Sequence, residues 1–270
     1  MSRSDPFVKA LDSAEAQFAE RGYHGVSMRQ VAEGAGISVS LVQYHFKTKE
    51  ALFSAVMERR IVAINHRRLA LLDAVEVNCK PSGKPAVEDV LQAFLEPTVL
   101  LSRDKASGGN YYAQLIAQVT NDPQPHARNI SRSFTDPIAR QTLRVLHLAL
   151  PELDRATLAW CYVFAVGSMI AAISPTGRVR LLSNNEADPD DVKTVMSLLV
   201  PFLTGAFERI AAMSKAGTLA LTPRSLATVL PLPDANYPQQ AESPTDSPPT
   251  SPSRRKAKPA TAKSIATRKT

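Results

Sequence analysis

Closely spaced helix starts and glycine breaks in the first fifty residues constrain the fold more than any other feature of the chain. Asp5 can cap a helix whose first residue is Pro6, and Gly22 can take the left-handed conformation that closes it. Between these signals the apolar residues recur at helical spacing: Phe7, Leu11, Ala14 and Phe18. This pattern predicts an amphipathic helix that must pack its apolar face against a partner.

Two more short helices follow at once. Ser27 and Gln30 have the spacing of a capping box, in which each side chain bonds the other residue's backbone N–H. Gly36 permits a tight turn, Ser38 can cap a third short helix, and Thr48 can cap a fourth. Three short helices with a glycine turn between the last two predict a helix-turn-helix, whose second helix enters the major groove of DNA.

The third helix divides into an inward face and an outward face. Val42 points inward, whereas Gln43, Ser40 and Val39 lie on other faces, where DNA can reach them. Gln can bond adenine bidentately, Ser can serve either base edge, and the methyl groups of Val can meet a thymine methyl. Residues that can instead reach phosphates are Tyr44, His45 and Lys49.

The net charge of +7 does not support DNA binding by the folded part. From residue 254 to the end there are seven basic residues and no acidic one, so residues 1–253 are formally neutral. Residues 231–270 are rich in Pro, Ser, Lys and Arg, a composition that predicts a disordered tail. This tail either keeps the chain soluble or adds sequence-independent attraction to DNA, and the sequence leaves both open.

Several features predict a soluble cytoplasmic protein that does not enter a membrane. The apolar run 158–173 is shorter than the roughly 20 residues that a membrane-spanning helix needs, so we expect a buried helix. Cys79 and Cys161 fit no metal site or disulfide framework, and we expect both to be reduced thiols. No signal peptide precedes the helical pattern.

An enzyme is disfavoured because the motifs that carry catalysis are missing. The sequence has no G-x-S-x-G elbow, phosphate-cradling glycine loop or H-E-x-x-H motif. Its five histidines show no metal-like spacing, so we expect neither a metal nor a cofactor: His24, His45, His66, His126 and His147. A small-molecule carrier whose DNA-binding half is vestigial is the alternative that remains.

Four spaced segments together resemble the DNA-binding domain of the TetR family of transcriptional regulators: 16–23, 27–32, 35–38 and 44–52. The resemblance implies that Ser27 and Lys49 meet phosphates and that Arg29 meets a base or a phosphate. It also implies a recognition surface formed by Val39, Ser40, Gln43, Tyr44 and His45. Gln43 stands where many members have tyrosine, so base reading can replace a phosphate contact there.

The resemblance also implies the rest of the architecture. We expect an all-α fold of about nine helices, with a DNA-binding domain at 1–50 and a ligand-binding and dimerisation domain at 51–220. Residues 152–173 and 188–216 suit the two helices through which such proteins form homodimers, with Asp188 as the cap of the second. The implied function is a repressor that a small apolar or amphipathic ligand releases from a near-palindromic double-stranded DNA operator.

A second resemblance concerns the ligand. Residues 198–202 and 43–46 are similar to a branch of the family that responds to fatty acids or acyl-thioesters. The residues that we expect to line the ligand pocket are large or soft apolar ones: Phe94, Tyr111, Tyr112, Phe134, Trp160 and Met169. Packing in the core is the competing role for each of them.

Overall fold

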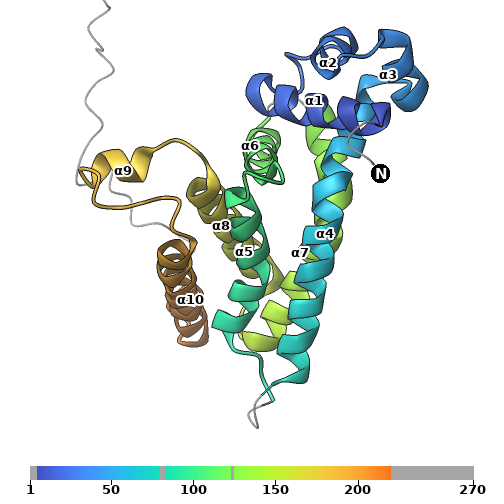
Figure 1. The fold of residues 1–270 in the computed structure, drawn as a ribbon. Coiled ribbons are helices and arrows are strands. Elements are labelled where there is room, and N and C mark those ends of the chain that lie inside the picture. The colour runs from blue at the N-terminus through green and yellow to red at the C-terminus, as the bar shows by residue number, and fades with distance from the viewer. Residues whose placement is uncertain (1–4, 80–82, 123–124, 220–270) are drawn as a thin grey trace, which may run out of the picture. The chain divides into compact units, whose positions relative to one another are not determined.

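The computed structural model describes residues 5–79, 83–122 and 125–219, and these residues are helical throughout, with connecting turns (Figure 1). They form ten α-helices and no β-strand, which confirms the predicted all-α class with one helix more than expected. The helices are α1 (Pro6–Arg21), α2 (Met28–Ala35), α3 (Val39–Phe46), α4 (Lys49–Val77), α5 (Val87–Arg103), α6 (Gly109–Thr120), α7 (Pro125–Ala149), α8 (Arg155–Ile173), α9 (Arg178–Leu182) and α10 (Val192–Lys215). The predicted tail at 231–270 lies outside the described residues.

The start signals of the first helices and the glycine stop of α2 work as the sequence predicts, whereas Gly22 ends α1 with φ of 71° and ψ of 170°, outside the left-handed helical conformation expected for it. The Asp5 carboxylate accepts the N–H of Phe7 at 2.9 Å, which caps α1. At α2 the Ser27 hydroxyl accepts the Gln30 N–H at 3.3 Å, and the Gln30 side-chain oxygen accepts the Ser27 N–H at 2.8 Å. Gly36 ends α2 in the left-handed conformation with φ of 65°. These local bonds fix where the turn lies before any tertiary packing is considered.

Helices α1, α2 and α3 share a small apolar core. Phe18, Val31 and Val42 are fully buried within it. Phe7 of α1 stacks on Phe46 of α3 with ring centroids 5.0 Å apart. Each buried side chain of this size stabilises the fold by about 1.5–3 kcal/mol. Packing of the buried face of α3 against α1 and α2 therefore fixes the orientation of its exposed face.

Helix α4 belongs to both parts of the chain. Thr48 caps it by accepting the Ala51 N–H at 3.1 Å, and Phe53 in its second turn packs edge-on against Phe18 at 5.1 Å. A buried ion pair also joins α1 to α4, because Arg60 donates to both carboxylate oxygens of Glu15 at 2.7 and 2.8 Å. The division of the chain at residue 50 stays a prediction, and it falls inside the first turn of this helix.

Helix α5 is the centre of the second part of the chain. It contacts α4, α6, α7, α8 and α10 (Figure 1). At its C-terminal end Arg103 donates to the carbonyl oxygens of Ala172 at 2.9 Å and Pro189 at 2.7 Å. These bonds fasten the end of α8 and the loop before α10 to the central helix.

The start of α10 differs from the prediction. Asp191, not Asp188, caps the helix, and its carboxylate accepts the N–H of Thr194 at 3.3 Å. The Asp188 carboxylate instead accepts from Arg180 at 2.7 Å and from the backbone N–H of Asp190 at 3.1 Å. Asp188 is engaged in the loop, and the helix begins at Val192, four residues beyond it.

Helices α8 and α10 are buried on one face only, whereas we expected 158–173 to be a buried helix. Trp160 and Phe164 on α8 are each 62% exposed, and Phe202 on α10 is 69% exposed. The opposite faces are buried, with Ala165 and Leu203 against the core. Both helices have the length and composition of a membrane span, a test that core helices of soluble proteins also pass.

Candidate nucleic-acid interface and ligand cavity

The outward face of α3 carries three of the predicted recognition residues. Ser40, Gln43 and Tyr44 are exposed, and Tyr44 is 78% exposed. Ser38 caps this helix by accepting the Leu41 N–H at 3.2 Å, and its hydroxyl lies 3.1 Å from that of Ser40. The face is polar except for the Tyr44 ring, and nothing in the described residues covers it.

Val39 and His45 are less accessible than the other members of the predicted surface. Val39 is half-buried and packs against the core. The His45 ring lies edge-on between Phe7 at 5.6 Å and Tyr44 at 5.4 Å. DNA contact by these two residues stays a prediction. Only the parts of each side chain that reach the surface could make that contact.

The start of α2 presents Ser27 and Arg29. Both are exposed, but the Ser27 hydroxyl already donates to the Gln30 side chain at 2.8 Å. Arg29 forms an exposed ion pair with Glu33 at 3.0 Å. Such surface pairs are worth only about 0.3–0.5 kcal/mol, so a phosphate can readily compete for this guanidinium.

Lys49 lies in the first turn of α4. Its ammonium nitrogen is 4.5 Å from the centroid of the Tyr23 ring, and burial lowers the pKa of Lys49 from its usual value. The Tyr23 hydroxyl donates to Glu50 at 3.1 Å, and burial raises the pKa of Tyr23 to about 12. The N-terminal end of a helix attracts anions, so a phosphate here meets both the helix end and the Lys49 charge.

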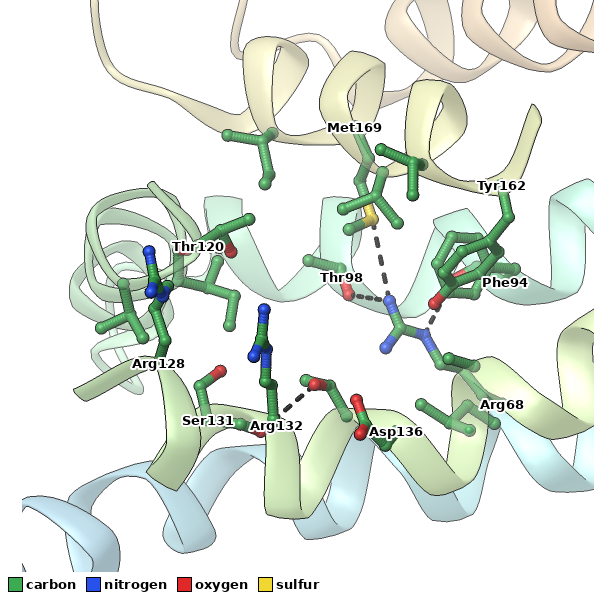
Figure 2. A pocket seen from close by; sticks show the side chains of 18 of the residues that line it. Arg68, Phe94, Thr98, Thr120, Arg128, Ser131, Arg132, Asp136, Tyr162 and Met169 are labelled. Atoms are coloured by element: carbon green, nitrogen blue, oxygen red, sulfur yellow. Dashed lines mark hydrogen bonds between the residues drawn. The ribbon is translucent and has the colours of Figure 1, made fainter. Parts of the chain in front are cut away.

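A cavity of about 270 Å³ lies among α4, α5, α6, α7 and α8 (Figure 2). Its described lining residues are Arg68, Phe94, Thr98, Tyr112, Ile116, Val119, Thr120, Arg128, Ser131, Arg132, Thr135, Asp136, Ile138, Ala139, Tyr162, Val163, Val166, Met169 and Ile170. Three residues that we expected at a ligand pocket, Phe94, Tyr112 and Met169, lie on its wall.

The other three expected residues do not line this cavity. Trp160 is on the exposed face of α8, where its ring lies 5.7 Å from that of Phe164. Phe134 and Tyr111 are half-buried side chains that pack against the core. The sequence identified these helices as pocket-forming but could not assign the face of each helix that turns inward.

Arg68 on α4 is the most unusual side chain in the cavity, because it is only 4% exposed. Its guanidinium donates to the carbonyl oxygen of Phe94 at 2.8 Å and to the Thr98 hydroxyl at 2.7 Å. It also lies 4.6 Å from the centroid of the Phe94 ring and 3.7 Å from the sulfur of Met169. Burial lowers the pKa of Arg68 from its usual value.

Sequence reasoning missed Arg68, although the sequence holds a signal for it. The buried positions of α4 in this region are Ile61, Ile64, Arg68 and Leu72, so an arginine occupies one position of an apolar helical stripe. A charged residue on a buried stripe is rare unless it is paired or functional. Arg128, Arg132 and Tyr162 carry no comparable pattern in the sequence.

Direct bonds connect the cavity region to the first three helices. On α6, which supplies cavity residues, Gln118 donates to the carbonyl oxygen of Ala19 at 2.6 Å. After α6, the Asp122 carboxylate lies 3.5 Å from the ring nitrogen of His24, and Arg128 of the cavity donates to the Asp122 carbonyl at 2.7 Å. Short contacts therefore join the helices of the cavity to α1 and to the turn that follows it.

Two family descriptions match this chain. Residues 10–56 match bacterial regulatory proteins of the tetR family, and residues 92–206 match the tetracyclin repressor-like C-terminal domain. The HTH-type transcriptional regulator RutR of Escherichia coli strain K12 is 41% identical over 94 residues, which cover 35% of this chain and 40% of RutR. The HTH-type transcriptional activator FasR of Mycolicibacterium smegmatis is 37% identical over 61 residues, or 23% of this chain and 28% of FasR. The chain thus aligns with less than half the length of either relative.

A solved structure extends the likeness to the whole described fold. The fatty acid degradation regulator FadR from Bacillus halodurans superposes with a TM-score of 0.52 at 14% identity, and the match covers 74% of this chain and 97% of FadR. At this identity the likeness concerns the fold alone. Because both domains of the family occur in order, with a capped helix-turn-helix at the start, the chain belongs to the TetR family of bacterial regulatory proteins.

Proposed function

We propose that this protein is a sequence-specific DNA-binding transcriptional regulator, and that it acts as a repressor. The observation that carries the proposal is the exposed polar face of α3, held outward by the buried Val42 and Phe46 on its other side. Gln43 and Ser40 on that face have the donors and acceptors that read base edges in the major groove. Lys49 and the start of α2 would meet phosphates and fix the register.

A homodimer fits the exposed apolar surface of α8 and α10. Trp160, Phe164, Leu198 and Phe202 are all more than 60% exposed in the single chain, which is costly for large apolar side chains in water. A second copy of the chain, related by a two-fold axis, would cover this surface. Two α3 helices would then enter successive major grooves about 34–36 Å apart on a near-palindromic operator.

Release by a small molecule requires that the ligand favour a conformation with wrongly spaced recognition helices. The cavity supports such a role because two of its walls connect to the helix-turn-helix. Gln118 on α6 bonds the backbone of α1, and Arg128 on α7 bonds Asp122, the partner of His24. The ligand would be apolar or amphipathic, since apolar side chains predominate on the walls.

Selection of bound DNA from random sequence tests the function directly. The full chain should enrich a site with two-fold symmetry, because a dimer reads each half-site with the same surface. Failure to enrich any sequence above background contradicts the proposal and favours a small-molecule carrier with a vestigial DNA-binding half. A promoter fusion with the selected site then determines the sign of regulation, since FasR is named as an activator.

We also infer that the protein works in the cytoplasm and is not an enzyme. RutR and FasR are named as transcriptional regulators, and an operator must be reached where the chromosome is. The apolar faces of α8 and α10 are assigned to the dimer and not to a membrane. Fractionation of cells that express the full chain should recover it in the soluble fraction together with DNA.

A further inference from the structure

We propose that the cavity around Arg68 binds a small apolar acid through its carboxylate, and that this acid is the effector of the regulator. The inference rests on the proposed function, because it names the chemical class of ligand to which that function responds. The charge, the hydrogen-bond donors and the size of the cavity support this class of ligand (Figure 2).

The buried charge of Arg68 is unbalanced within the cavity. All its described hydrogen-bond partners are neutral, the closest being the Phe94 carbonyl at 2.8 Å and the Thr98 hydroxyl at 2.7 Å. No carboxylate lies within ion-pair distance of its guanidinium among the residues that the structure describes. A buried cation without a counter-ion is unfavourable, and an anion that enters the cavity removes the imbalance.

The other charged side chains of the cavity are mostly positive. Arg128 and Arg132 extend from α7 toward the same space in Figure 2, whereas Asp136 is the one acidic residue among the described lining residues. The Arg128 Nε atom is buried and has no hydrogen-bond partner among the described residues. The cavity therefore combines an excess of positive charge with an N–H donor that is still available.

Two phenol groups add hydrogen-bond donors to the cavity. Tyr112 and Tyr162 line the cavity, and burial raises the pKa of each to about 12. Both hydroxyls therefore keep their protons at neutral pH and can donate to a carboxylate. Neither donates a hydrogen bond to any other described residue, so both are available to a ligand.

The size of the cavity and the chemistry of its walls favour a small ligand with an apolar body. A volume of about 270 Å³ equals the space of about nine water molecules, at about 30 Å³ each, so it holds a ligand of roughly ten non-hydrogen atoms. Apolar side chains from α6 and α8 supply most of the remaining wall, including Ile116, Val119, Val166 and Ile170. This combination suits an aromatic or short-chain carboxylic acid, whereas a volume of about 270 Å³ holds only part of a long-chain acyl-thioester.

Guanidinium geometry favours a carboxylate over a point-like anion. Arg presents its N–H groups in a planar fork that matches two carboxylate oxygens. In Figure 2 the Arg68 guanidinium lies between α5 and α7 beside the cavity. Its Nη1 atom donates only a long bond of 3.4 Å, to the Asn65 side-chain oxygen, so this nitrogen is the one most readily turned to a carboxylate. Inorganic phosphate is the control anion, because it carries charge without an apolar body.

Calorimetric titration of the full-length protein tests the proposal with benzoate and hexanoate as probes. Their neutral counterparts, benzamide and hexanamide, have nearly the same size and shape. We expect both acids to bind and to raise the midpoint of thermal unfolding of the protein. Both amides should bind at least about 30-fold more weakly, because a loss of about 30-fold is the lower end of the effect of removing one partner of a buried charge pair. The same loss is expected for the acids with Arg68→Met.

Two controls keep the test specific. Arg68→Met should stay folded by circular dichroism, because replacing a buried charge with an apolar side chain is often neutral or stabilising. Arg140→Met removes an equal charge from the exposed face of α7, outside the cavity, and should leave acid binding unchanged. Tyr112→Phe should weaken acid binding several-fold without affecting the amides.

The proposal is overturned if the amides bind as well as the acids, if Arg68→Met binds the acids normally, or if no probe acid binds. Binding of a long-chain acyl-thioester without binding of either short acid also overturns it. Failure of the proposed function has a different signature, because acid binding would persist in a protein that selects no DNA. Operator binding that ignores every acid would reject the effector role alone.

Discussion

Removing the negative charge of Glu15 tests whether the buried ion pair between α1 and α4 holds the DNA-binding helices to the rest of the chain. The Glu15 side chain is 3% exposed and that of Arg60 is 13% exposed, with two N–H···O bonds of 2.7 and 2.8 Å between them. Those hydrogen bonds hold the pKa of Arg60 above its usual value. Glu15→Gln keeps the shape of the side chain but leaves the Arg60 cation without its counter-ion.

The expected loss follows from this burial. Breaking a buried pair costs about 3–5 kcal/mol, and we expect about 3 kcal/mol because Arg60 is near the surface and keeps its bond to the Ser107 carbonyl. For a domain of 150–250 residues this lowers the midpoint of thermal unfolding by about 6–12 °C. Circular dichroism at one fixed protein concentration measures it, since dimerisation makes the midpoint depend on concentration.

Asp12→Asn is the matched control for this experiment. Asp12 also bonds an arginine of α4, with 2.6 Å between its carboxylate and Arg59, but the Asp12 side chain is 49% exposed. An exposed pair is worth at most about 1 kcal/mol, so the midpoint should fall by less than about 4 °C. Equal effects of the two substitutions would refute the assignment of stability to burial of the Glu15 pair.

Three further predictions concern DNA binding and assembly. Gln43→Ala should make the free energy of DNA binding less favourable by about 1–3 kcal/mol at one or two operator positions and relax base preference there, whereas Lys49→Ala should weaken binding to all sequences about equally. Gel-shift titration on operator variants distinguishes the two effects. An equal loss on every sequence for Gln43→Ala would remove Gln43 from the recognition surface. Phe202→Glu should convert the dimer to a monomer in analytical ultracentrifugation with the helical content unchanged, because it places a charge on the apolar surface of α10, where Phe202 is 69% exposed in the single chain. A persistent dimer would assign the interface elsewhere. Deletion of residues 231–270 should reduce the slope of log affinity against log salt concentration by about 6 for each chain if all seven basic residues of its tail contact phosphates, at about 0.9 for each phosphate. An unchanged slope would reject a role of the tail in DNA binding.

Local rules were sufficient to predict the first three helices from the sequence. Asp5, Ser27 and Ser38 each cap the helix that they precede, because a cap depends on residues only two or three positions away. The division of α3 into a buried and an exposed face follows from helical spacing alone, as Val42 and Gln43 illustrate. The contacts that these residues make with DNA stay predictions.

Features that depend on tertiary packing were less predictable. Periodicity showed that α8 is apolar but not that Trp160 faces outward, since a helix that is apolar on nearly every side gives no direction for the core. The Arg68 cavity needs five helices to come together, and no local pattern indicates which side chains converge. The cap of α10 is Asp191 and not Asp188, and Asp188 instead bonds Arg180, eight residues before it, a contact that no helix-start rule predicts.

The continuity of α4 has a mechanical consequence. From Lys49 at its start to Arg68 at the cavity the helix rises about 28 Å, at about 1.5 Å per residue. A tilt of about 6° around the Arg68 end would move the Lys49 end sideways by about 3 Å. That distance is close to the spacing of about 3.4 Å between successive base pairs. A tilt of this size in α4 on ligand binding would thus shift the start of the helix next to α3 by nearly one step along the DNA.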